Sequence, residues 1–61
     1  MRLFVPTMDA FLVEYDPTGR VRFDNEDWTQ PSVQERRAII HAATDQIEHL
    51  KELLDVLEIQ P

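Results

Sequence analysis

Two histidines and an aspartate repeat at intervals of four residues in the second half of the chain. His41, Asp45 and His49 would share one side of a helix, a pattern that suggests the ligands of a metal site. However, His41 and His49 would lie about 12 Å apart along the helix axis, whereas zinc–ligand bonds measure about 2 Å. Asp45 with one histidine provides too few ligands. We therefore predict a solvated polar face, with no metal and no other cofactor.

The remaining reactive side chains do not form a recognisable catalytic set. Ser32 is better placed to cap a helix, and neither histidine is placed beside a hydroxyl group that it could activate. The single glycine, Gly19, falls in a predicted turn, so no glycine-rich phosphate loop is expected. A chain of 61 residues also has little volume for a concave site. The sequence predicts a protein that is not an enzyme.

A short acidic stretch, "DNEDW", surrounds the only tryptophan of the chain. Asp24, Glu26 and Asp27 would form an acidic rim around Trp28, and an aromatic anchor with a polar rim is typical of a protein–protein hot spot. We predict that these four residues bind a protein partner. The alternative is a solvated linker in which Trp28 packs against the sheet or the start of the helix.

The formal net charge is −6, and most of the excess lies near the C-terminus, where five acids from residue 45 onward face only one base, Lys51. A negative field repels phosphate backbones, so direct nucleic-acid binding is not expected. No apolar run approaches the roughly 20 residues of a membrane span, and Pro6 and Asp9 interrupt the N-terminus too early for a signal peptide. We expect a cytoplasmic protein without a membrane partner.

Residues 10–23 carry the pattern of a β-hairpin. Apolar and polar residues alternate before Asp16-Pro17-Thr18-Gly19, which suits a type I turn followed by a glycine bulge. This turn would place Tyr15 opposite Val21, Glu14 opposite Arg22 and Val13 opposite Phe23. One face of the hairpin would then hold the apolar side chains of Phe11, Val13, Tyr15, Val21 and Phe23. Residues 2–5 are a candidate third strand.

The C-terminal part of the chain predicts one long helix. Ser32 and Glu35 fit a capping box, with Thr29 as the alternative cap, and neither Gly nor Pro follows Pro31 until Pro61. We therefore expect an α+β fold in one small domain: a β-hairpin or three-stranded antiparallel meander over 1–23, an acidic connection over 24–31, and a long amphipathic helix over 32–59.

Apolar residues of this helix form a heptad-like seam. Val33, Ile40, Ile47 and Leu54 occupy one seam position, and Arg36, Ala43, Leu50 and Leu57 occupy the other. β-branched residues at the first position and Leu at the second favour two parallel helices, although the sequence leaves the orientation open.

The helix is too long for its sheet to cover. It would span about 40 Å, whereas strands of about six residues span about 20 Å. The uncovered apolar side chains predict a homodimer through the helix, with an interface formed by Ile40, Ile47, Leu50, Leu53, Leu54 and Leu57. The alternative is a monomer whose helix breaks near Thr44-Asp45 and folds back on itself.

These features predict a small, acidic, non-enzymatic protein-binding module that regulates or inhibits a partner protein. Size and charge associate it with the inhibitors of phages and mobile elements. An acidic nucleic-acid mimic, which occupies a basic DNA- or RNA-binding cleft, is one alternative. A structural oligomerisation subunit is another.

Overall fold

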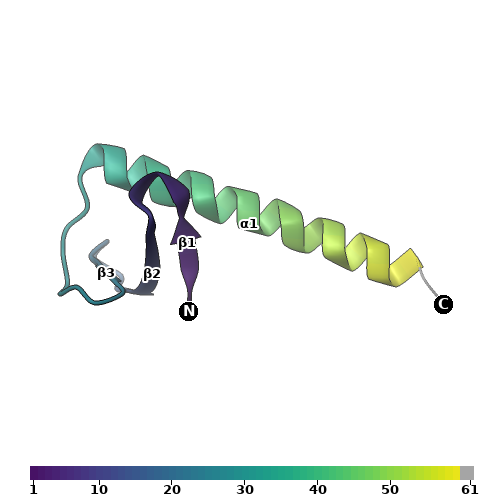
Figure 1. Ribbon diagram of the computed structural model, residues 1–61, viewed down its shortest axis with the longest axis horizontal. Helices are drawn as coiled ribbons and strands as arrows, with labels where there is room; N and C mark the ends of the chain where they lie inside the picture. The colour runs from purple at the N-terminus through teal and green to yellow at the C-terminus, as the bar shows by residue number, and fades with distance from the viewer. Residues whose placement is uncertain (60–61) are drawn as a thin grey trace.

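A computed structural model describes residues 1–59 and confirms the predicted α+β fold, with the three-stranded form of the sheet. The antiparallel sheet has the order β1-β2-β3 and is followed by one helix, α1. The elements are β1 (Leu3–Val5), a 3-10 turn η1 (Pro6–Met8), β2 (Ala10–Tyr15), β3 (Val21–Phe23) and α1 (Val33–Ile59). Figure 1 shows the sheet packed under the first turns of α1, with the rest of the helix projecting away from it. The molecule measures 45 × 22 × 19 Å.

The candidate third strand is present as β1. The chain reverses through η1, where Pro6 begins the turn and Asp9 ends it in the left-handed conformation, with φ of 48°. The Asp9 N–H donates to the Pro6 carbonyl at 3.2 Å. β1 then pairs with β2 so that Leu3 lies opposite Leu12 and Val5 opposite Ala10.

The predicted hairpin turn is confirmed in detail. Gly19 has φ of 93°, and its N–H donates to the Asp16 carbonyl at 3.1 Å. The Asp16 N–H donates to the Arg20 carbonyl at 3.0 Å, which closes the three-residue loop. A left-handed residue after a type I turn is the glycine bulge expected for this loop length.

The predicted pairing of Val13 with Phe23 is wrong. Tyr15 lies opposite Val21 and Glu14 opposite Arg22 as predicted, but a β-bulge between Leu12 and Glu14 then places Leu12 opposite Phe23. The predicted apolar face therefore changes, since Leu12 is 3% exposed whereas Val13 is only half-buried and Tyr15 is 70% exposed.

The bulge follows from the pairing of β2 with two strands at once. β1 places Leu12 on the same face as Leu3 and Val5, whereas the hairpin turn alone would place it on the opposite face from Val21. One extra residue reverses the side on which following side chains point, so it brings Leu12 and Val21 to one face. The buried core consists of these side chains and one helix residue: Leu3, Val5, Leu12, Val21, Phe23 and Ala42.

The helix begins with the predicted capping box. The Glu35 N–H donates to Ser32 Oγ at 3.2 Å, and the Ser32 N–H donates to Glu35 Oε1 at 2.8 Å. Thr29 is not the cap, because it forms a β-bridge with Val21. α1 then continues to Ile59 without the break near Thr44 that a folded-back monomer requires.

Candidate interaction surface

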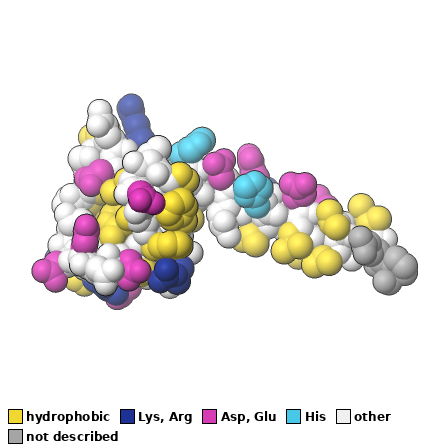
Figure 2. All heavy atoms as spheres, in the orientation of Figure 1, with side chains coloured by type: hydrophobic (Ala, Val, Ile, Leu, Met, Phe, Trp, Pro, Cys, Tyr) yellow, Lys and Arg dark blue, Asp and Glu magenta, His cyan; other side chains and the backbone are white. Residues whose placement is uncertain are grey.

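The half of α1 beyond the sheet is exposed on every side. Each residue from 44 to 59 is exposed, including the large apolar side chains of Ile47, Leu50, Leu53, Leu54, Val56, Leu57 and Ile59. In Figure 2, hydrophobic side chains gather along one edge of the projecting helix and acidic side chains along the other. Exposed apolar surface of this extent is typical of an interaction surface.

The sheet and the heptad seam use different faces of α1. The sheet packs against Ala42, with Ala38, Ile39 and Ala43 at its margin. The seam, which we define as Ile40, Ala43, Ile47, Leu50, Leu54 and Leu57, runs beside this contact. Ile40 is 57% exposed although it lies in the half of the helix that the sheet covers. Every seam residue is therefore exposed except Ala43, which is partly buried against the core.

The predicted interface residues all lie on the seam or directly beside it. Ile40, Ile47, Leu50, Leu54 and Leu57 belong to the seam, and Leu53 widens it on the side that continues the sheet-facing surface. Helical geometry places Ile47, Leu50, Leu54 and Leu57 on successive turns of one stripe. They form one continuous surface that the chain itself does not cover within residues 1–59.

Acidic residues line the projecting helix outside the seam, from Asp45 on the opposite side to Glu58 at the edge of the seam. Asp45, Glu48, Glu52, Asp55 and Glu58 are all exposed, with Lys51 as the only base among them. Within residues 1–59, the ion pairs of this helix are limited to His41 with Asp45, whose Nε2 and Oδ2 atoms are 3.5 Å apart. This row therefore concentrates uncompensated negative charge.

The candidate metal face does not assemble into a site. His41 contacts Asp45, while His49 lines a shallow hollow of about 250 Å³ between β1 and α1, together with Phe4, Pro6, Ala42, Asp45 and Gln46. Across the described part of the chain, no three acidic, histidine or cysteine side chains are arranged to hold a metal ion. Across the same residues, no helix has the length and apolar character needed to cross a membrane.

The acidic loop folds back along β3 in a way that the sequence did not predict. The N–H groups and carbonyls of Val21 and Thr29 exchange two hydrogen bonds of 2.9 Å, and the Glu26 N–H donates to the Phe23 carbonyl at 3.1 Å. Asn25 takes the left-handed conformation that this turn needs, with φ of 65°. Asn tolerates that conformation better than most residues, which is the only local signal for the turn.

The four predicted partner-binding residues lie on this loop and are exposed. Trp28 is 41% exposed, with the Arg20 guanidinium 6.0 Å from its ring centre. Asp24 lies 3.5 Å from Arg2, so its charge is partly compensated. Glu26 and Asp27 make no ion pair within residues 1–59. The loop therefore presents an aromatic side chain beside two free carboxylates.

A third exposed cluster was missed by the sequence analysis. On the sheet face opposite the core residues Leu3 and Val5, Phe4 and Phe11 pack with their ring centres 5.1 Å apart. The Arg2 guanidinium lies 4.2 Å above the Phe11 ring and also faces Asp24. The alternation of Leu3, Phe4 and Val5 was the signal for this cluster, because it puts Phe4 on the opposite face from the two core residues.

Two carboxylates have their pKa lowered by local hydrogen bonds. The Thr18 hydroxyl, which donates to Asp16 at 2.6 Å, is the main cause that lowers the pKa of Asp16 to about 2. The Arg20 and Thr18 N–H groups and the Arg20 guanidinium also donate to it, while partial desolvation opposes the shift. At the helix start, the Ser32 N–H is the main cause that lowers the pKa of Glu35. The hydrogen bonds that cause the two pKa shifts stabilise the hairpin turn and the start of the helix. Both groups lie away from the seam.

Comparison with known proteins finds no family model, no curated protein and no solved structure that matches this chain.

Proposed function

We propose that this chain is a non-enzymatic protein-binding module that forms a homodimer through α1 and regulates or inhibits a partner protein. The observation that carries the proposal is the seam, which is uncovered from Ile40 to Leu57 although its composition is that of a helix–helix interface. Burying four Leu or Ile side chains contributes roughly 6–12 kcal/mol before the entropy cost of association is subtracted. This gain is of the same order as the cost of association, so the seam is the part of the chain best able to stabilise a dimer.

The small size of the chain supports the same proposal. A domain of about 60 residues buries a modest fraction of its surface and commonly relies on a second stabilising device. The chain has no Cys for disulfides, and only six hydrophobic residues are buried in the described part. A second copy packed on the seam supplies additional burial where the sheet ends.

Analytical ultracentrifugation over a range of concentrations tests the homodimer. We expect a species of twice the 7.2 kDa chain mass that dissociates on dilution. A species that sediments at the chain mass at every concentration would contradict the proposal.

For the partner-binding face, we propose the loop formed by Asp24, Glu26, Asp27 and Trp28. Its backbone is held by the bridge between Val21 and Thr29, so little ordering entropy is lost on binding. The loop lies at the sheet end of the molecule, away from the projecting half of α1 (Figure 1). Size and acidic charge associate such a module with inhibitors from phages and mobile elements, which would act in the cytoplasm of a host.

Affinity purification with matched baits tests this face. A specific partner should be retained by the parent protein and by Phe4→Ala, and lost with Trp28→Ala. Phe4→Ala is a matched control because it also removes an exposed aromatic side chain of similar exposure, 43% against 41%. A protein retained equally by all three baits would contradict the assignment of the loop.

An acidic nucleic-acid mimic is the second candidate, and the acidic row of α1 favours it. Five carboxylates between Asp45 and Glu58 cover about 20 Å, so neighbouring charges are about 5 Å apart on average, against the 3.4 Å phosphate spacing of one DNA strand. Such a mimic would occupy a basic DNA- or RNA-binding cleft of another protein.

Salt dependence separates the two candidates. Binding of the acidic row to a basic cleft should weaken by orders of magnitude between low and moderate salt, whereas docking of the loop, in which Trp28 is the anchor, should weaken much less. A third possibility, a purely structural oligomerisation subunit, predicts tight self-association and no retained partner in the same purification.

A further inference from the structure

We infer that two copies of this chain pair antiparallel along the seam, so that the N-terminal half of each α1 lies against the acidic C-terminal half of the other. This inference rests on the homodimer proposed above and assigns the arrangement of the two helices. It differs from the parallel arrangement that the residue types of the heptad pattern favour by themselves.

The charges of the two halves of α1 are complementary. Residues 33–44 contain one acid, Glu35, and two bases, Arg36 and Arg37, whereas residues 45–59 contain five acids and one base. A parallel pair would place the two acidic halves side by side and would bring Arg36 of one copy against Arg36 of the other. An antiparallel pair places opposite charges together, and it also opposes the two helix dipoles favourably.

The apolar side chains also match in the antiparallel direction. With Ile47 of one copy opposite Leu50 of the other, Ile40 comes opposite Leu57 and Ala43 comes opposite Leu54. Every layer of the seam is then apolar, and the small Ala43 faces a large residue, which suits close packing. Arg36 falls outside these layers, so no arginine is buried between the helices.

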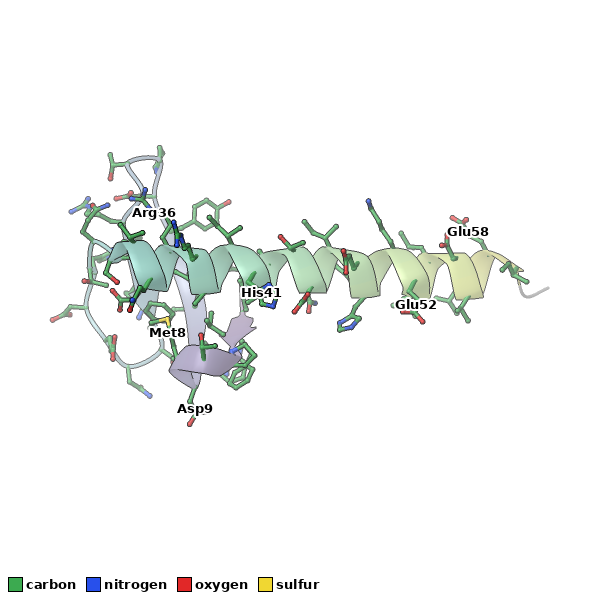
Figure 3. The ribbon with its side chains drawn as sticks, turned by 90° about the horizontal axis from the view of Figure 1, so that it is seen from above. Met8, Asp9, Arg36, His41, Glu52 and Glu58 are labelled. Carbon is green, nitrogen blue, oxygen red and sulfur yellow. The ribbon has the colours of Figure 1, made fainter. Side chains whose placement is uncertain are left out.

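The same alignment pairs charges at the edge of the seam. Arg37 and Glu58 occupy equivalent flanking positions, and antiparallel helices bring such positions together. Figure 3 shows that Arg36 and Glu58 point to the same side of α1 at its opposite ends, so a copy turned end over end brings the basic end of one helix near the acidic end of the other. Within residues 1–59, neither Arg37 nor Glu58 has an ion-pair partner in its own chain.

The side of α1 that the second copy would contact is exposed beside the sheet. Ile40 is exposed whereas Ala42, which faces the sheet, is buried. The C-terminal half of a second copy can therefore lie beside the sheet without displacing a core side chain. Each sheet would sit at an opposite end of the dimer.

Disulfide trapping tests the direction of pairing, and the absence of native Cys makes single substitutions unambiguous. Ile40→Cys and Leu57→Cys are each prepared separately and then mixed and oxidised. We expect disulfides only in the mixture, between position 40 of one chain and position 57 of the other. In each variant alone the two thiols would be about 25 Å apart, far beyond the limit of about 7 Å between Cα atoms.

Glu52→Cys, on the acidic side of α1, reports random collisions. Disulfides formed by Ile40→Cys alone and Leu57→Cys alone, above this control, would overturn the antiparallel arrangement and leave the proposed homodimer standing. If the parent sediments as a monomer, both the homodimer and its direction are overturned.

A charge exchange gives a second test that does not depend on a cysteine in the seam. Arg37→Glu should weaken the dimer about threefold to tenfold by sedimentation, because it places two carboxylates together twice per dimer. Adding Glu58→Arg to the same chain should restore the affinity. In a parallel dimer these positions would be about 30 Å apart, so a double variant as weak as the single one would overturn the inference.

Discussion

Ile40 and Ala42 stand two residues apart on α1 and face different surroundings. Ala42 is 6% exposed against the sheet, whereas Ile40 is 57% exposed beside it. Two residues that are two positions apart in a helix differ in direction by about 200°. One face of α1 can therefore pack against the sheet while another face contacts a second molecule. This separation means that the fold of the monomer and the proposed association can be perturbed independently.

Leu50→Asp and Leu54→Asp should dissociate the dimer. Each leucine is about half exposed in the single chain, so the substitutions cost the monomer little, but each removes two buried leucines from the dimer. At about 1.5–3 kcal/mol for each leucine, the dimer should weaken at least a hundredfold and its melting temperature should fall. Sedimentation and thermal unfolding at matched concentrations measure both effects.

Glu48→Ala is a suitable control for these variants, because it lies outside the seam and Ala retains helix propensity. It should sediment as the parent does. If Leu50→Asp and Leu54→Asp also sediment and melt like the parent, the seam is not an interface.

The bulge predicts unequal costs for two neighbouring residues of β2. Leu12→Ala should lower the free energy of unfolding by about 2–5 kcal/mol, because it leaves a cavity among Leu3, Val5 and Phe23. Val13→Ala should cost clearly less, since Val13 is only half-buried. Urea unfolding at one protein concentration gives both values. Without the bulge the order would be reversed, because Val13 would then face the core.

The same bulge marks the limit of prediction from the sequence. The turn at Asp16–Gly19 and the capping box at Ser32 were predicted correctly because each depends on residues close together in the chain. The pairing of Leu12 depends on β1, which the sequence supported only as a candidate, and so the local alternation gave the wrong face. The bridge between Val21 and Thr29 is likewise set by a turn whose only local signal is Asn25.

The exposure of the candidate surface was predicted in part, by comparing lengths. The sequence indicated that α1 outreaches the sheet, and the exposure of residues 44–59 agrees with that comparison. It did not indicate that Ile40 stays exposed beside the sheet, because the face that a helix turns towards a sheet depends on contacts with β1 and η1. Whether a second copy covers the seam remains a prediction.

Loss of the helix cap should destabilise the start of α1. Ser32→Ala removes the hydroxyl that accepts from the Glu35 N–H, and we expect the free energy of unfolding to fall by about 1 kcal/mol. Hydrogen exchange should show faster opening in the first turn, with little change beyond Ala43. Ser32→Asp, which keeps an acceptor at the cap, should behave like the parent; equal loss in both variants would show that the cap is not the cause.

Acid should weaken the hairpin through Asp16. Its pKa in the folded protein is about 2, below the ordinary value of 3.8, so the folded state favours the ionised carboxylate. The stabilisation is therefore complete above about pH 4 and is lost as the pH falls through 2. Asp16→Asn lacks this ionisation, so the difference in the free energy of unfolding between the parent and Asp16→Asn should be largest near pH 5 and should shrink towards pH 2.

The comparison is best made in the Leu54→Asp background, where dissociation of a dimer does not add to the pH dependence. Because the other carboxylates titrate in both proteins, only Asp16 contributes to the difference. A difference that stays constant from pH 5 to pH 2 would contradict the role of the Thr18 and Arg20 hydrogen bonds in holding this turn.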